Sequence, residues 1–140
     1  MLTSISIVEL EKAIETLKEA MEFAEQVKGN VTHYKIARDA CIQRFEYCIE
    51  LPWKVAMKKI GSQTKFPKPA IREMARADLI DSAEDWLEFI EARNDSNHSY
   101  DEDIAQKVFL QIQKFYVQVQ ELLLRLSKSP CYVRYKTIVE

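Results

Sequence analysis

Glycine, proline and long apolar runs are scarce in this sequence, and each scarcity excludes a class of structure. Two glycines and four prolines among 140 residues are too few for the many turns of a sandwich of short strands. No apolar run approaches the roughly 18 residues of a membrane span. The N-terminus has neither the basic start nor the continuous apolar stretch of a signal peptide. The sequence therefore predicts a single, mostly helical domain in the cytoplasm, without a membrane segment.

Cysteine and histidine are also rare, which argues against the common disulfide and metal patterns. Three cysteines and two histidines occur, and their spacing fits no zinc site and no Glu-x-x-His pair. Cys41 and Cys48 are seven positions apart on a predicted helix, about 10 Å along its axis, which is too far to bridge. Both glycines fall at predicted helix ends, so a phosphate-binding glycine loop is excluded. We expect no metal and no cofactor.

Helical periodicity dominates the chain from residue 7 to residue 126. Apolar residues recur at steps of three and four in three long segments, with a shorter helical pair between the second and the third. The three long segments cover residues 7–27, 31–60 and 99–129. This pattern predicts an all-α fold, an antiparallel four-helix up-and-down bundle with a short extra helix, over residues 1–129. The tail, residues 130–140, is rich in β-prone residues and has no predicted place.

Local signals predict where these helices begin and end. Capping boxes start the first and last long helices at Ser6 and Ser99. Gly29 supplies a left-handed stop to the first helix. Pro52 should kink or divide the second helix, and Pro69 suits the first position of the short helix.

Charge is unevenly distributed although the net charge is only −2. Residues 53–76 contain seven lysines or arginines against one acid, whereas residues 77–103 contain ten acids against one arginine. One interpretation is a surface for a polyanion beside another for a basic partner. The alternative is that neighbouring helices carry complementary solvated faces.

The densest group of chemically versatile side chains lies in the stretch EARNDSNHSYDE, residues 91–102. Arg93, Asn94, His98 and Tyr100 occur here between two predicted helices. A histidine that titrates near neutral pH can move protons, and a guanidinium can hold a phosphate with two hydrogen bonds. Together they suit metal-free cleavage of a phosphodiester. A plain polar turn, capped by Ser99, is the alternative interpretation.

Several stretches resemble one bacterial family, the nucleotidyltransferase substrate-binding proteins. The similarity is carried by RDACIQRFEYCIELPWK, by the pattern P-x-x-x-I-R-E-M-A, by WLEFIEARNDSNHSYDEDIA and by the helix containing Phe115 and Tyr116. It covers roughly residues 7–127. The Arg-x4-His spacing also resembles the signature of the wider HEPN superfamily (higher eukaryotes and prokaryotes nucleotide-binding). The tail after Pro130 falls outside the resemblance, and Pro52 departs from the helix-compatible residue expected there.

The resemblance implies a HEPN-like bundle that forms a homodimer and associates with a minimal nucleotidyltransferase. In the superfamily, residues matching Arg93 and His98 carry a metal-independent ribonuclease activity in toxin–antitoxin pairs. A tyrosine matching Tyr100 receives AMP from the nucleotidyltransferase, which silences the toxin. Asn94 lies within the same motif and could orient a phosphate or the histidine.

Two functions and one purely structural role remain open at this point. The chain is either a ribonuclease toxin with Arg93 and His98 catalytic, or a non-catalytic subunit in which these residues bind the phosphate of a nucleotide or substrate. The third possibility is a structural helical dimer whose motif no longer functions. Both functions require the same residues at the same spacing, so the motif cannot distinguish between them.

Overall fold

The computed structural model describes residues 2–128, with side chains from residue 7 onward, and this part of the chain contains helices and no strand. The all-α prediction is confirmed, and the tail at 130–140 lies outside the described residues. No helix within residues 2–128 is long and apolar enough to cross a membrane. The elements are α1 (Leu2–Gln26), α2 (Val31–Cys48), α3 (Glu50–Ile60), α4 (Pro67–Arg76), α5 (Ala83–Asp95), the 3-10 turn η1 (Ser96–His98) and α6 (Glu102–Ser127).

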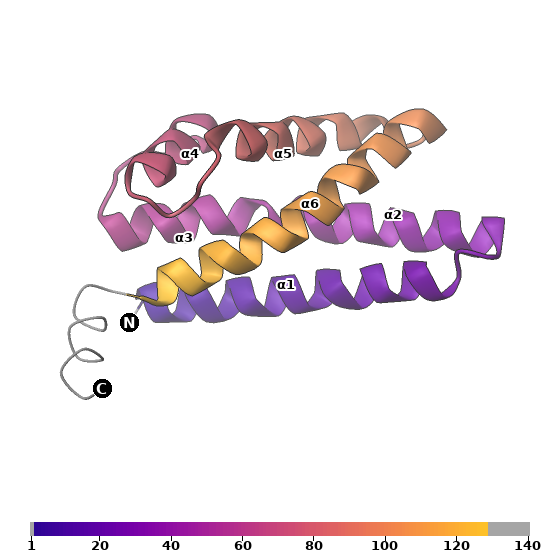
Figure 1. The fold of residues 1–140 in the computed structure, drawn as a ribbon, viewed down its shortest axis with the longest axis horizontal. Coiled ribbons are helices and arrows are strands. Elements are labelled where there is room, and N and C mark those ends of the chain that lie inside the picture. The colour runs from indigo at the N-terminus through magenta and orange to yellow at the C-terminus, as the bar shows by residue number, and fades with distance from the viewer. Residues whose placement is uncertain (1, 129–140) are drawn as a thin grey trace.

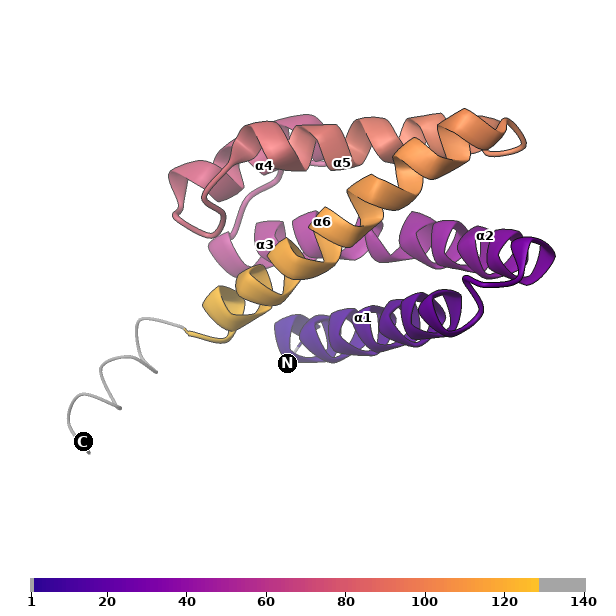
Figure 2. The ribbon, with the colours of Figure 1, turned by 45° about the vertical axis from the view of Figure 1, so that its right-hand side comes forward.

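The helices form the predicted antiparallel bundle (Figure 1). Helices α2 and α3 follow one another in nearly the same direction and run antiparallel to α1, while α5 and α6 supply the other two arms and α4 is the short extra helix. Helix α6 crosses the bundle diagonally, from the end of α5 toward the start of α1 (Figures 1 and 2). As a result, the α1–α2 turn and the α5–α6 turn lie at the same end of the molecule.

The second long helix is divided, as the proline in it predicts. Helix α2 ends at Cys48 and α3 begins at Glu50, so Pro52 lies in the first turn of α3. A missing N–H group costs nothing there, because the first N–H groups of a helix have no partner within the helix. The short helix α4 begins at Pro67 and not at Pro69, so that prediction was wrong by two residues.

Two predicted helix ends were also wrong. Helix α1 begins at Leu2, before the expected cap at Ser6. Gly29 does not adopt the left-handed conformation that was predicted for it. The glycine with a positive φ is Gly61, at 73°. The side chain of Asn30 makes the turn into α2 by accepting a hydrogen bond from the His33 N–H at 3.0 Å.

Aromatic rings from three helices meet at the centre of the core. Phe45 of α2, Trp86 and Phe89 of α5, and Phe115 of α6 are fully buried and pack edge to face, with ring centroids 5.2–5.7 Å apart. Each such pair contributes about 0.5–1.5 kcal/mol beyond the burial of its area. This cluster fixes α5 and α6 against α2 and so determines where the α5–α6 turn lies.

The two cysteines of α2 belong to the same interior. Cys41 and Cys48 are fully buried and free. Burial raises the pKa of the Cys41 thiol to about 11 and that of the Cys48 thiol to about 12, because a thiolate is poorly stabilised away from water. Both side chains therefore act as small apolar core residues.

Candidate functional site at the turn between α5 and α6

The predicted site residues lie in and beside one short connection. Helix α5 ends at Asp95, continues into the 3-10 turn of residues 96–98, and leads through residues 99–101 into α6. Ser96, 4% exposed, anchors this connection. Its Oγ lies 2.6 Å from both Glu46 Oε2 on α2 and the Arg93 carbonyl oxygen, so its single proton is shared between two acceptors. The turn is thereby attached to α2 at its first residue.

Arg93, in the last turn of α5, is partly buried and loosely paired. Its Nη1 lies 3.5 Å from Glu46 Oε2, and both side chains are about one-third exposed, at 33% and 31%. Its Nε is buried and finds no hydrogen-bond partner among the described residues. A guanidinium carries five N–H donors, so this arginine retains donors that a phosphate oxygen could accept.

His98 and Tyr100 form an exposed pair on the outer side of the turn. The histidine Nδ1 lies 3.3 Å from the tyrosine Oη, and their rings meet edge to face with centroids 6.0 Å apart. Tyr100 is 86% exposed, and Asn94 is exposed nearby in the sequence. Both the imidazole and the phenol are therefore open to an RNA strand or to another enzyme.

The single chain presents the predicted motif as two groups. Arg93 faces Glu46, whereas His98 faces Tyr100, and within residues 2–128 no hydrogen bond or ion pair joins Arg93 to His98. Nor does this part of the chain contain a group of three or more His, Cys, Asp or Glu that could hold a metal ion. The chemistry that the arrangement allows is proton transfer and phosphate binding by side chains.

The start of α6 differs from the prediction in a way that affects phosphate binding. Asp101, and not Ser99, is the N-cap: its carboxylate accepts hydrogen bonds from the N–H groups of Asp103 at 2.9 Å and Ile104 at 3.2 Å. A carboxylate at a helix N-terminus occupies the position that a bound phosphate would take. The Asp101 carboxylate therefore competes with a phosphate at this helix end, and Arg93 is the better candidate for phosphate binding.

An ion pair near the turn, between a buried arginine and a glutamate that is 54% exposed, was missed at the sequence level. Arg38 of α2, with 3% of its side chain exposed, donates from Nη1 and Nη2 to the two carboxylate oxygens of Glu102 at 2.6 and 2.8 Å. Its Nη1 also donates to Gln106 Oε1 at 3.1 Å, and its guanidinium lies 5.8 Å from the centre of the Tyr34 ring. Hydrogen bonding to Arg38 lowers the pKa of the Glu102 carboxyl and raises that of the arginine.

The sequence did contain a signal for this pair. Arg38 precedes Ile42 by four positions and Phe45 by seven, which places it on the apolar stripe of α2. A charge on such a stripe must be buried and needs a partner. What the sequence did not contain was the identity of that partner, 64 positions away.

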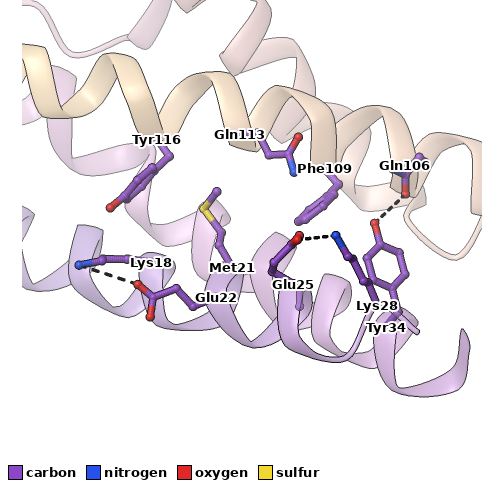
Figure 3. Close-up of a pocket in the computed structure, with 11 residues that line it drawn as sticks. Lys18, Met21, Glu22, Glu25, Lys28, Tyr34, Gln106, Phe109, Gln113 and Tyr116 are labelled. Atoms are coloured by element: carbon purple, nitrogen blue, oxygen red, sulfur yellow. Dashed lines mark hydrogen bonds and ion pairs between the residues drawn. The ribbon is translucent and has the colours of Figure 1, made fainter. Parts of the chain in front are cut away.

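A groove between α1 and α6 is the second feature that the sequence did not reveal (Figure 3). It encloses about 640 Å³, within the range of small-molecule sites. Lysines and glutamates of α1 and of the turn after it line one side, paired as Lys18–Glu22 at 3.8 Å and Lys28–Glu25 at 2.5 Å. The remaining lining residues are Met21, Ala24, Tyr34, Gln106, Phe109, Gln113 and Tyr116. No single stretch of sequence could predict it, because three helices contribute.

Ion pairs between helices account for part of the charge asymmetry. Four acids within residues 77–103 pair with bases from other elements, at distances of 2.6 to 3.9 Å: Asp81 with Arg125, Glu88 with Lys114, Glu91 with Lys68, and Glu102 with Arg38. Of these four bases only Lys68 belongs to the basic stretch, so the pairs connect the two stretches at one point and explain only part of the asymmetry. The paired acids also repel an approaching polyanion less than free ones would.

Comparison with known proteins gives one family and relatives of the same fold. The family described as "Nucleotidyltransferase substrate binding protein like" matches residues 6–128. A Haemophilus influenzae protein named probable ribonuclease HepT is 28% identical over 99 residues, which cover 65% of this chain and 68% of that protein.

Two solved structures have a similar fold. One, from Haemophilus influenzae, was described as revealing the fold of a substrate-binding domain of a nucleotidyltransferase. It has a TM-score of 0.75 at 23% identity, over 87% of this chain and 99% of that one. The other, from Thermus thermophilus, has a TM-score of 0.71 at 28% identity, over 85% of this chain and 99% of that one. At 23% identity, the first comparison shows the fold alone.

Proposed function

The chain belongs to the nucleotidyltransferase substrate-binding protein family, and we propose that it is a metal-independent endoribonuclease toxin, active as a homodimer and paired with a minimal nucleotidyltransferase. The observation that carries the proposal is the exposed His98–Tyr100 pair, with its 3.3 Å contact, next to a loosely held Arg93. The name of the relative, probable ribonuclease HepT, supports the same reaction.

His98 is the proton-transfer group of the proposed reaction. A neutral imidazole takes the proton from a ribose 2′-hydroxyl, whose oxygen then attacks the adjacent phosphorus. The bond from phosphorus to the 5′-oxygen breaks, and that oxygen leaves with a proton from an imidazolium. The products are a 2′,3′-cyclic phosphate and a free 5′-hydroxyl. A homodimer brings two histidines to one cleft, one as base and one as acid, and so completes a site that one chain presents in halves.

Arg93 is the phosphate-binding group, and Asn94 beside it orients the phosphate or the histidine. Releasing Arg93 from Glu46 costs little, because a partly exposed ion pair of 3.5 Å contributes at most about 1 kcal/mol. The freed guanidinium can then donate two hydrogen bonds to the charge that develops on phosphorus.

Tyr100 is the proposed switch. In the modification, its Oη forms a bond to the α-phosphorus of ATP, pyrophosphate leaves, and the phenolic proton passes to a base in the nucleotidyltransferase site. With 86% of the residue exposed, the phenol can reach another enzyme. The Oη that receives AMP lies 3.3 Å from the histidine Nδ1, so the modification places a bulky anion beside the histidine, where it repels RNA phosphates.

Two measurements test this function. The intact mass after co-expression with the minimal nucleotidyltransferase partner should increase by one or more AMP units, and the increase should disappear in Tyr100→Phe. Purified dimer free of AMP should cleave RNA without added metal, and His98→Ala should abolish cleavage while the circular dichroism spectrum is unchanged. Intact RNA after incubation with AMP-free wild-type dimer would overturn the proposal.

A second candidate function is a non-catalytic subunit that binds the nucleotide or substrate of the nucleotidyltransferase. The groove of about 640 Å³ between α1 and α6 favours it, because three aromatic rings and two amides line a cavity large enough for a nucleotide. Arg93 and His98 do not line this groove, and in this case they bind a phosphate outside it without chemistry. The expected result is a stable complex with the nucleotidyltransferase, with no RNA cleavage. Loss of nucleotide affinity in Arg93→Ala would place the phosphate at the turn, and unchanged affinity in that variant would place the nucleotide in the groove. If neither partner nor nucleotide binds, this function is excluded.

A further inference from the structure

We propose that Arg38 is a positioning residue for the His98–Tyr100 turn: by holding Glu102, it fixes the end of a segment whose beginning Ser96 already attaches to α2. The inference rests on the proposed function for its catalytic consequence only. Its structural consequence, a turn that is held at both ends, can be measured whether or not the protein cleaves RNA.

The turn is attached to α2 at two points. At its first residue, the Ser96 Oγ lies 2.6 Å from Glu46. At its last, the two carboxylate oxygens of Glu102 accept from Arg38 at 2.6 and 2.8 Å. The two α2 residues are eight positions apart, about 12 Å along the helix. Everything between the anchors, including His98 and Tyr100, is therefore placed relative to one rigid helix.

The bidentate hydrogen bonding of Arg38 to Glu102 makes it suitable for positioning the turn. A guanidinium that donates to both oxygens of a carboxylate fixes the distance and the orientation of the two groups, which a single contact does not. The third contact, to Gln106 Oε1 at 3.1 Å, lies one helical turn further along α6. Arg38 thus fixes the direction of the first turn of α6 as well as its position.

Stability alone is a poor reason for a charge at this place. Burying a charge such as the Arg38 guanidinium costs free energy, which the half-exposed Glu102 carboxylate offsets only in part, and replacing buried charged side chains with apolar ones is often neutral or stabilising. Position 38 lies on the apolar stripe of α2 and is 2% exposed, so a leucine or methionine would suit the core there. What an apolar residue cannot supply is a specific hydrogen-bonded alignment between α2 and the start of α6.

The experiment compares Arg38→Met with Arg44→Met as a matched control. Arg44 is on the same helix, carries the same charge and contacts Glu19 at 3.4 Å, but it faces α1 and its side chain is 33% exposed. Hydrogen exchange of the amides of residues 97–103 should become at least about tenfold faster in Arg38→Met and stay unchanged in Arg44→Met. The amides of the aromatic core should exchange as in the wild type in both variants.

The kinetic readout separates positioning from simple loss of fold. In RNA cleavage, kcat of Arg38→Met should fall by about tenfold or more with KM nearly unchanged, because the residue does not touch RNA and acts through the placement of His98. Arg38→Lys should recover only part of kcat, since an ammonium cannot bind the carboxylate with two parallel hydrogen bonds. If Arg38→Met does not fold, Arg38→Lys and Glu102→Gln carry the same test.

The possible failures are distinguishable. Unchanged exchange at residues 97–103 in the folded variants overturns the positioning role, whatever the enzyme does. Faster exchange in a protein whose wild type never cleaves RNA leaves the positioning role standing and rejects the ribonuclease function. An active wild type with an equally active Arg38→Met rejects positioning and leaves the ribonuclease function intact.

Discussion

Two arginine–glutamate pairs connect α2 to the α5–α6 turn, and they are built in opposite ways. In the pair Arg38–Glu102, two hydrogen bonds of 2.6 and 2.8 Å hold an arginine side chain that is 3% exposed. In the pair Arg93–Glu46, one contact of 3.5 Å holds an arginine side chain that is 33% exposed. The same two residue types therefore hold two helices together in the pair Arg38–Glu102, whereas in the pair Arg93–Glu46 they leave a cation that can bind another group. Burial of the arginine and the number of contacts distinguish the pairs, since the glutamates show the opposite order of exposure, 54% for Glu102 and 31% for Glu46.

The largest expected effect is on catalysis, from the loosely held arginine. Arg93→Ala should lower the rate of RNA cleavage about 100- to 1000-fold, the usual result of removing a group that stabilises transition-state charge, while the midpoint of thermal unfolding changes little. Arg44→Ala is the control, because that arginine is also 33% exposed and its glutamate partner is at 3.4 Å. A similar loss of activity in both variants would mean that general positive charge, and not this site, drives cleavage.

The next effect is on stability, from the pair with the buried arginine. Glu102→Gln should lower the melting temperature by about 2–5 °C, because the buried Arg38 guanidinium loses its charged partner, while the mutated side chain itself is 54% exposed. Glu46→Gln should lower it less, since Arg93 can turn toward water. Differential scanning calorimetry of the two variants in the same buffer measures both values. Equal shifts would show that the two pairs do not differ as their burial indicates.

The pH dependence of stability should show the same contrast. Hydrogen bonds from Arg38 lower the pKa of the Glu102 carboxyl in the folded protein. The stability contributed by this carboxylate is therefore complete above the ordinary glutamate pKa of about 4.3 and is lost as the pH falls through the lowered folded value. Urea midpoints measured between about pH 6 and pH 3 should fall less steeply in Glu102→Gln than in the wild type. Glu73, whose pKa Thr64 and Ser62 also lower, remains as a common background in both proteins.

The smallest effect concerns the other anchor of the turn. Ser96→Ala should destabilise the protein by about 1 kcal/mol, because it removes one hydrogen bond to Glu46 from a buried hydroxyl. Chemical denaturation gives the value directly. Hydrogen exchange should also distinguish the two anchors. In Ser96→Ala the amides of residues 97–99 should exchange faster than those of residues 101–103, and in Arg38→Met the order should be reversed.

Local patterns in the sequence predicted the helices well and some of their ends poorly. Steps of three and four between apolar residues locate every long helix, because burial of one face is a local property of the sequence. The cap of α6 was placed at Ser99 because Glu102 three positions later completes a capping box. In the structure Arg38 binds Glu102 instead, and Asp101 takes the cap. The residue that binds Glu102 lies 64 positions away, so the local capping pattern could not indicate it.

The candidate site was predicted only as a set of residues. The positions of Arg93, Asn94, His98 and Tyr100 follow from the motif, and the structure places all four at one turn. Their division into a loosely paired arginine and an exposed histidine–tyrosine pair depends on Glu46 and Ser96, which the sequence does not connect to the motif. The groove could not be predicted either, because its walls come from helices that meet only in the folded chain.

The two buried cysteines allow the rate at which the core opens to be measured. A thiol reagent attacks only the thiolate in contact with solvent, and Cys41 and Cys48 are completely buried, with pKa values raised to about 11 and about 12. Both must therefore wait for α2 to separate from the core before they react. Their rate of labelling by the thiol reagent, followed by mass spectrometry, reports how often the interior opens and needs no denaturant. Two opening rates can then be measured separately in one sample. Thiol labelling gives the rate for the core around Phe45, and amide hydrogen exchange gives the rate for the turn near Tyr100.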